Sequence, residues 1–439
     1  MQANQLQLSD SPFRQDFYFG RKGSQVTRSL EAFGGNFEHS IENSSGLDDA
    51  AAAYFQSLLN GKKFTVHTGA RRVKYIDLFC GGGGLSLGLQ NALKTLGLKP
   101  SLVLAADIDR AALRLVREHF GALTTRDCSV EDLVEYAIDY SGGHKQFLQP
   151  PQITDPAILA NKGKVDLLIG GPPCQGHSNL NNKTRRSDPR NLLYFVMPAF
   201  AVALEIPNIV IENVPTIQRA KENVVELSRS LLRSNGYQVE EIILNASDYG
   251  VAQSRRRHFL VASKSSIDHL FACASSIKTP HLSFEQINGR LLDRIFPNEM
   301  IETNGKLSEE NVTRINHLHD NDVHNLQNDL RPDCHKESHT YPSVYGRIHG
   351  HLPAQTITTG FSSPGRGRYI HPTERRTITV REAARLQAFP DWYWQREFIS
   401  ELSRAQLTKI IGDAVPGNMI DPIAITLFSE MALQNRGAA

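Results

Sequence analysis

Apolar residues gather into short, nearly continuous runs in the central part of the chain. Four of these runs are VKYIDLF at 73–79, SLVLAADID at 101–109, VDLLIGG at 165–171 and NIVIENV at 208–214. Small residues or a helical pattern follow each run. Continuous apolar runs are typical of strands buried on both faces, and their alternation with helices predicts right-handed crossovers. We therefore expect an α/β fold built on a largely parallel sheet.

The alternation of apolar runs and helical patterns changes after the fourth run. Residues 237–251 and 255–263 read as two further strands, which could form an antiparallel pair. From 264 to about 375 the chain is rich in His, Asn, Pro and Gly, so we expect a second region of irregular, short-stranded structure. A helical pattern returns at 379–389 and again at 421–435.

The first 70 residues show one clear element. The stretch 48–63 has a helical pattern, with Asp48 or Asp49 able to cap its start and Gly61 able to end it. The remainder of this region is polar, with scattered Gly and Ser. We expect it to be a weakly ordered extension.

Composition narrows the class of protein. The chain has 439 residues, of which 40% are hydrophobic and 21% charged, as in ordinary globular proteins. It contains no apolar run of about eighteen residues and no secretory signal pattern at its start, so we expect no membrane span and a cytoplasmic location. The five cysteines form no C-x-x-C motif, and no H-E-x-x-H occurs, so we predict no metal site. A net charge of +2 is too small to indicate a nucleic-acid ligand by itself.

A glycine loop, Gly81 to Gly84, follows the first strand. No GKS or GKT follows it, as a phosphate-binding loop would require, and the G-x-G-x-x-G spacing of dinucleotide sites is poorly kept. Asp107 ends the next strand, about 25 residues on, which suits a carboxylate that binds ribose hydroxyls. Asp127, at the end of a third strand, could read an adenine amino group. A plain tight turn is the alternative, but three such features favour a nucleoside ligand.

The stretch GGPPCQGHS brings Cys174 to a strand end behind two prolines, which fix the backbone. A thiol with a pKa of about 8.5 needs such a setting to act as a nucleophile, whereas a buried structural cysteine would fit this polar loop poorly. Glu212 ends another strand and could share a proton with a substrate ring nitrogen, or be a helix cap or surface acid. Arg255 and Arg257 would share one face of a strand, and suit a carbonyl or phosphate, unless they form a solvated basic edge.

These motifs, together with TVREAARLQAFPDWY and IGDAVPGNM, occur in the order and rough spacing of the DNA (cytosine-5) methyltransferases. The chain resembles this family from about Tyr75 to Ala424, in a bacterial or phage-like layout. The resemblance implies a Rossmann-like S-adenosylmethionine-dependent methyltransferase domain at 71–264 and a smaller, irregular target-recognition domain at 265–375. Residues 376–439 would form a hinge and return to the catalytic domain, and 1–70 would be an extension of unknown role.

The resemblance also implies which residues bind S-adenosylmethionine. Phe79 would pack on the adenine, the glycine loop would approach the methionine part, and Asp107 would bind the ribose. Asp127 and Cys128 would border the adenine, with Leu193 in the same pocket. The implied set is Phe79, Gly81, Gly82, Gly83, Gly84, Leu85, Asp107, Ile108, Asp127, Cys128, Pro172, Leu193, Asp413 and Ala414.

The family chemistry assigns four catalytic residues. Cys174 would attack carbon 6 of cytosine, Glu212 would contact the ring nitrogen and amine, and Arg257, supported by Arg255, would steady the base carbonyl. Carbon 5 then takes the methyl group, and loss of its proton with elimination of Cys174 releases the product. The base must be flipped out of the duplex for this reaction.

Double-stranded DNA is the implied partner. The polar, basic stretch NLNNKTRRSDPRN at 179–191 resembles a loop that closes over the flipped base, although a solvated surface loop would look similar. The implied DNA contacts are Gln175, Ser178, Arg186, Arg190, Thr358, Thr359, Arg366 and Arg368. We expect a monomer that protects DNA in a restriction-modification system, with a cognate endonuclease encoded nearby.

Two departures and three alternatives qualify this interpretation. Asp413 stands where the family usually has Asn, which removes an amide donor near the cofactor, and Gly417 stands where a second proline is common. A tRNA cytosine-5 methyltransferase would share the motifs but have a more compact recognition region. A catalytically inactive DNA-binding regulator would have lost Cys174, Glu212 or the arginines. A nicotinamide dehydrogenase would leave PPCQ and ENV unexplained.

Overall fold

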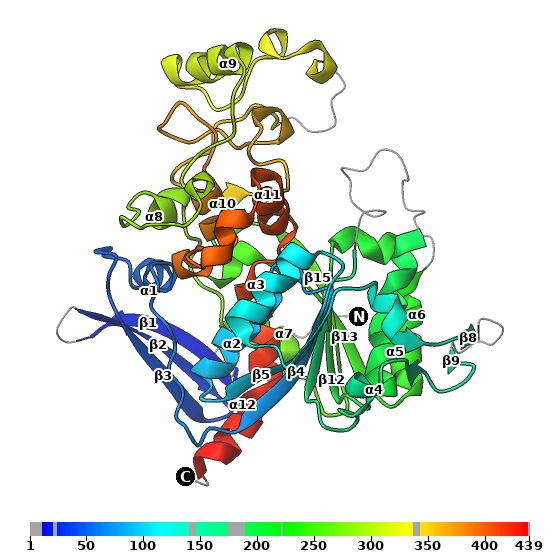
Figure 1. Ribbon diagram of the computed structural model, residues 1–439. Helices are drawn as coiled ribbons and strands as arrows, with labels where there is room; N and C mark the ends of the chain where they lie inside the picture. Colours follow the sequence, from blue (N-terminus) through cyan, green and yellow to red (C-terminus); the bar gives the residue numbers. More distant parts are fainter. Residues whose placement is uncertain are drawn as a thin grey trace, which may run out of the picture.

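The computed structural model, described here for residues 11–20, 24–139, 146–173, 189–220, 223–336 and 343–437, is centred on a seven-stranded sheet (Figure 1). Its strand order is β13-β15-β12-β11-β4-β5-β6. β15 is antiparallel to β12 and β13, and the remaining pairs are parallel. The strands are β4 (Arg72–Leu78), β5 (Lys99–Ala106), β6 (Thr124–Arg126), β11 (Leu167–Gly170), β12 (Asn208–Asn213), β13 (Gln238–Asn245) and β15 (Arg256–Ser263). The predicted α/β fold and the antiparallel pair are confirmed.

Helices cover both faces of this sheet, which explains why its central strands are apolar throughout. One face packs on α2 (Gly84–Thr95), α3 (Arg110–Phe120), α7 (Leu270–Ser276) and α12 (Asp421–Gly437). The other packs on α5 (Val196–Ala203) and α6 (Val224–Ser234). The carboxyl ends of the parallel strands therefore form one edge, where α2 and α3 begin (Figure 1).

The described part of the N-terminal region is ordered, so the expectation of weak order is wrong for residues 13–19 and 25–59. β1 (Phe13–Phe19), β2 (Gln25–Ala32) and β3 (Gly35–Glu42) form an antiparallel sheet, followed by α1 (Ala50–Leu59). Asp49 caps α1, since its side chain accepts a hydrogen bond from the Ala52 N–H. The sheet packs on α12. Gly35 lies so close to this helix that a Cβ atom there would be 2.0 Å from the Leu433 side chain.

The region above the sheet in Figure 1 is irregular, as predicted. It contains α8 (Phe284–Asn288), α9 (Glu309–Asp320) and β16 (Ala354–Gln355), which pairs with β14 (Gln253–Ser254). Around α9 lies a small separate core made of Ile315, Leu318, Leu326, Val344, Tyr345 and Ile370.

The chain then returns through α10 (Val380–Leu386) and α11 (Arg404–Asp413) to α12, which confirms both helical predictions. α10 and α11 share a core with α1 and α8, so the N-terminal region, the irregular region and the return segment meet there. Minor elements are β7 (Val134–Glu135), β8 (Ile138–Asp139), β9 (Gln146–Phe147), β10 (Gln152–Ile153) and α4 (Pro156–Leu159). Over the described part of the chain, the helices are too short or too polar to cross a membrane.

Candidate active site

The glycine loop joins β4 to α2 at the carboxyl edge of the sheet. Phe79, Gly81 and Gly83 have positive φ values of 56°, 49° and 76°. Glycine adopts this conformation freely, but at Phe79 it costs energy, which marks a functional constraint. A Cβ at Gly84 would lie 2.3 Å from the carbonyl oxygen of Val415, so only glycine fits there. The loop therefore presents bare backbone on a rigid support.

Asp107 lies directly beside this loop, after β5. One carboxylate oxygen accepts the Gly81 N–H at 2.8 Å and the other accepts the Asp109 N–H at 2.8 Å. Burial raises the pKa of Asp107, and the two hydrogen bonds oppose that shift. The structure thus places the predicted ribose-binding carboxylate against the predicted glycine loop.

The other residues predicted to bind the cofactor have different surroundings. Phe79, Cys128 and Leu193 pack against the same hydrophobic cluster, although they come from three separate segments. Ile108, which follows Asp107 in the chain, is 76% exposed, an unusual exposure for an isoleucine. Asp127 follows β6 and pairs with Arg110 at 2.8 Å, in an exposed ion pair. Leu85 differs from these residues, because its side chain is buried in the core under α2.

Asp413 and Ala414 lie at the end of α11, close to the same edge. The Asp413 carboxylate accepts from Lys409 at 3.0 Å, and the same ammonium lies 3.3 Å from Asp109. Both carboxylates raise the pKa of Lys409 against the effect of burial. The residue that departs from the family pattern is therefore neutralised by a lysine that also contacts the Asp107 turn.

The second group of predicted residues meets at the ends of β11 and β12. Glu212 is 6% exposed and its carboxylate lies 2.8 Å from the Arg257 Nε atom. Burial raises the pKa of Glu212, while Arg257 and Arg255 lower it. A Cβ at Gly171 would lie 2.9 Å from the other Glu212 oxygen, so this carboxylate touches the segment that leads to Cys174.

Neighbouring contacts fix this segment. The Asn213 side chain donates to the Pro172 carbonyl at 3.1 Å and accepts from the Val214 N–H at 2.9 Å. Pro172 is therefore held at the same edge as Glu212. Cys174, Gln175, Ser178 and Arg186 lie outside the described residues, as does the side chain of Arg190.

Arg255 faces inward as predicted, with Arg256 exposed on the opposite side. The Arg255 guanidinium donates to the carbonyl of Ile357 at 2.7 Å, which ties the catalytic edge to the irregular region. Gln253 strengthens the same junction by accepting the Ile357 N–H at 2.8 Å. The sequence pattern gave no signal for this contact, because the partners are about a hundred residues apart.

The remaining predicted DNA contacts have different surroundings. Thr359 and Arg366 are exposed, and the Thr358 hydroxyl shares a 2.8 Å hydrogen bond with Tyr369. Arg368 is buried and donates to the carbonyls of His324 and Arg347 at 2.7 and 2.9 Å. Its contacts hold the irregular region together.

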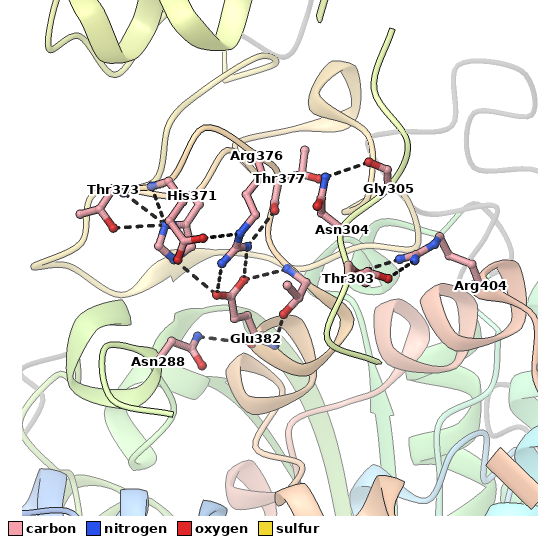
Figure 2. A network of polar contacts seen from close by, with 12 residues as sticks. Asn288, Thr303, Asn304, Gly305, His371, Thr373, Arg376, Thr377, Glu382 and Arg404 are labelled. Atoms are coloured by element: carbon pink, nitrogen blue, oxygen red, sulfur yellow. Dashed lines mark hydrogen bonds and ion pairs between the residues drawn. The ribbon is translucent and has the colours of Figure 1, made fainter. Parts of the chain in front are cut away.

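One cluster has the composition of a metal site: His371, Glu374 and Glu382 (Figure 2). The His371 Nδ1 atom accepts the N–H groups of Thr373 and Glu374 at 3.2 and 3.0 Å, so its proton sits on Nε2, facing Glu382. Arg376 donates to both Glu382 oxygens, at 2.7 and 2.8 Å. Burial would raise the pKa of Glu382, but Arg376 and His371 outweigh it and lower that pKa to about 2. These donors occupy the oxygen lone pairs that a cation would need. The network therefore has a structural role: it holds Glu382, and with it α10, in place.

Comparisons with known proteins identify the family to which this chain is similar. Residues 73–429 match the family described as C-5 cytosine-specific DNA methylase. Type II methyltransferase M1.BsuMI of Bacillus subtilis (strain 168) is 37% identical over 348 residues, covering 79% of this chain and 78% of the relative. Type II methyltransferase M.XorII of Xanthomonas oryzae pv. oryzae is 30% identical over 387 residues, covering 79% and 81%.

Solved structures show the same fold. A putative DNA modification methyltransferase encoded within an E. coli prophage aligns with a TM-score of 0.53 at 23% identity, over 82% of this chain and 99% of that one. The S. pombe Dnmt2 methyltransferase aligns with a TM-score of 0.54 at 18% identity, over 82% and 99%. The Rossmann-like methyltransferase fold is therefore confirmed.

Proposed function

This chain belongs to the C-5 cytosine-specific DNA methylase family and is a DNA (cytosine-5)-methyltransferase, and we propose that it uses S-adenosylmethionine to methylate carbon 5 of a cytosine flipped out of a specific duplex sequence. One observation carries the proposal. The buried Glu212–Arg257 pair lies beside Gly171, three residues before Cys174, at the sheet edge that also holds the Asp107 loop.

The residues at the glycine loop fit S-adenosylmethionine, which supplies an activated methyl group when bound. Asp107 can accept from ribose hydroxyls. Phe79 and Ile108 offer apolar surface to an adenine ring, with Asp127 at its rim. The bare backbone from Gly81 to Gly84 allows close approach of the amino-acid part.

The chemistry follows from the second group of residues. The Cys174 thiolate adds to carbon 6 of cytosine, while a proton held by Glu212 goes to the ring nitrogen, which makes carbon 5 nucleophilic. The raised pKa of Glu212 favours its holding that proton. Arg257, 2.8 Å from Glu212, can contact the base carbonyl as well. After methyl transfer, solvent water would take the carbon 5 proton, the Cys174 thiolate would leave carbon 6, and the ring-nitrogen proton would return to Glu212, which restores the ring.

Among the predicted DNA contacts, the exposed Thr359 and Arg366 suit direct contact with phosphates or base edges. Arg368 would act indirectly, by holding the loops that carry them. Gln175, Ser178, Arg186 and Arg190 remain proposals from sequence, as do a monomeric state and a cytoplasmic location.

A mechanism-based trap tests the covalent step. Purified protein is incubated with S-adenosylmethionine and a duplex that carries 5-fluorocytosine at its target site. We expect a denaturation-resistant complex with wild type and none with Cys174→Ser. A complex that survives this substitution would overturn the assignment of the nucleophile.

Bisulfite sequencing tests the substrate. DNA and tRNA from a methylation-free host that expresses the protein are both sequenced. We expect new 5-methylcytosine in DNA, always within one short sequence; new methylation in tRNA alone would refute the DNA proposal.

Because curated relatives are named Type II methyltransferases, we further propose that the methylation protects DNA against a cognate endonuclease. DNA from the expressing host should then resist an endonuclease that recognises the same sequence. DNA that is methylated at this sequence but still cleaved would refute the protective role.

A further inference from the structure

A cavity of about 180 Å³ lies on the side of α2 that faces α1, away from the carboxyl edge of the sheet. Seven segments of the chain enclose it: α1 and the turn after it, α2, the end of α3, the turn before β14, α8, the stretch from α10 to Arg396, and the segment at Asn418. Part of its wall, the end of α1 and the turn after it, lies before residue 73, where the family match begins. The cavity is therefore partly built from sequence outside that match.

The charged residues around this cavity are all basic. Lys62, Lys63, Lys94, Arg385 and Arg396 line it, and no Asp or Glu does. Arg385 is neutralised by Asp391 at 3.0 Å, and Lys62 pairs with Glu42. Within the described part of the chain, Lys94 and Arg396 form no ion pair.

These cations are close enough to affect one another. Burial lowers the pKa of Lys94, and the charge of Lys63 lowers it further. Lys63 and Arg396 both contribute to a lowered pKa at His119, after burial as the main cause. Like charges that converge without a counter-charge are destabilising, so an anion bound among them would be favoured.

Several aromatic side chains form part of the cavity wall. Phe55, Phe64, Phe120 and Trp392 line it, and the Lys63 ammonium lies 4.3 Å from the centre of the Trp392 ring. A cavity of about 150 Å³ is enough to hold a benzene molecule. There is consequently room for one flat ring between these side chains.

A polar atom at the wall has no partner. The His119 Nε2 atom lies 2.8 Å from the carbonyl oxygen of Tyr393, which places the ring proton on Nε2. The Nδ1 atom is then an acceptor, and it is buried without a hydrogen-bond partner. An unpaired buried acceptor costs free energy.

Side chains of this wall contact the glycine loop, but the cavity and the loop remain separate. His119 stacks on Tyr393 with 3.8 Å between ring centres, and the Tyr393 hydroxyl donates to the Gly82 carbonyl at 2.7 Å. A Cβ at Gly83 would lie 2.7 Å from Phe120, so side chains separate the loop from the cavity. The two sites are distinct neighbours.

We propose that this cavity binds a mononucleotide, with its base between the aromatic side chains and its phosphate at Lys94, Lys63 and Arg396. The base provides a flat ring that can pack on the aromatic side chains. The phosphate provides the counter-charge that the basic side chains lack.

Tryptophan fluorescence reports directly on this site. The chain has two tryptophans, of which Trp392 lines the cavity and Trp394 is buried elsewhere. AMP, GMP, CMP and UMP are titrated into the full-length protein, with adenosine and inorganic phosphate as partial ligands. We expect saturable quenching by at least one mononucleotide and binding at least tenfold weaker for both partial ligands. Trp392→Phe should remove the signal while calorimetry still detects binding.

Matched substitutions locate the site. Lys94→Met and the exposed Arg396→Gln should each weaken mononucleotide binding about tenfold, the loss of one charged hydrogen bond. Lys99→Met removes an exposed lysine on β5 and should change nothing. Asp107→Ala tests for binding in the glycine loop and should also leave the affinity unchanged, whether or not the protein uses S-adenosylmethionine. Thermal melting checks that each variant is folded.

Three results would overturn the proposal. The first is no saturable binding of any of the four mononucleotides. The second is binding that Asp107→Ala abolishes, which would place the ligand in the glycine loop. The third is binding that is as tight for adenosine or phosphate alone, or that is unaffected in both Lys94→Met and Arg396→Gln.

Discussion

The buried ion pair between Arg28 and Asp421 should decide whether the N-terminal sheet is an integral part of the enzyme. Arg28 lies on β2 and Asp421 begins α12, with 3.1 Å between guanidinium and carboxylate. Their side chains are only 6% and 10% exposed. The Arg28 Nε atom also donates to Gln15 on β1 at 2.6 Å. Arg28→Met keeps a flexible, unbranched apolar side chain and removes the charge.

The expected loss is large because Asp421 stays behind without its cation. Removing one partner of a buried ion pair lowers the free energy of unfolding by about 3–5 kcal/mol. The whole free energy of unfolding of a typical protein is about 5–15 kcal/mol. Arg28→Met with Asp421→Asn leaves no buried charge, so this double variant should be more stable than Arg28→Met alone. Urea unfolding measures all of these differences.

The loss should also depend on pH. Burial raises the pKa of Asp421, and Arg28 opposes this shift, so the pKa should rise further without Arg28. The pKa of Asp421 is about 4 in the unfolded chain and higher in the folded protein. At pH values between these two pKa values, the folded state binds more protons than the unfolded state. Stability therefore falls as pH rises through this range, and Arg28→Met should cost more at pH 8 than at pH 5.

A control comes from the same sheet. Arg14 and Asp16 form an ion pair on β1 with side chains 72% and 50% exposed, so Arg14→Met should have a much smaller effect. The reasoning fails if Arg28→Met unfolds at the same urea concentration as Arg14→Met, or if its cost is the same at both pH values.

Three further outcomes are expected. Cys80→Ala should keep methyltransferase activity where Cys174→Ala abolishes it, because the Cys80 thiol is buried and its pKa is raised by burial; equal loss in both, with cofactor still bound, would contradict this. Gly88→Ala should destabilise the protein by about 1–3 kcal/mol in thermal melting, since its Cβ would lie 1.9 Å from the Gly417 carbonyl oxygen. Asp413→Asn should change the melting temperature little, because its ion pair with Lys409 is half-exposed; a shift of many degrees would contradict this.

Sequence reasoning succeeded where the chemistry depends on residue type at a strand end. The glycine loop, Asp107, Glu212 and Arg257 all follow or begin strands with strongly apolar patterns, so their positions could be inferred together. In a parallel sheet the carboxyl ends of strands share one edge, and the topology then brings these residues close. Their mutual distances come only from the structure.

The same reasoning missed the N-terminal sheet for a physical reason. In β1 only Phe13 is buried, and in β3 only Phe37 and Ile41 are, so no continuous apolar run marks these strands. Polar residues such as Arg28 are buried there only because a partner 393 positions later neutralises them. Contacts of this range leave no local pattern in a single sequence.

Asp413 shows how a departure from a motif can be compensated by contacts that the motif does not include. An aspartate at this position adds a negative charge near Asp107 and Asp109. Lys409 lies one helical turn before it and contacts both Asp413 and Asp109, at 3.0 and 3.3 Å. The spacing of four residues on a helix could have revealed the first contact, but only the fold reveals the second. The lysine also opposes the raised pKa of Asp107, so the carboxylate proposed to bind ribose stays ionised more readily with Lys409 present.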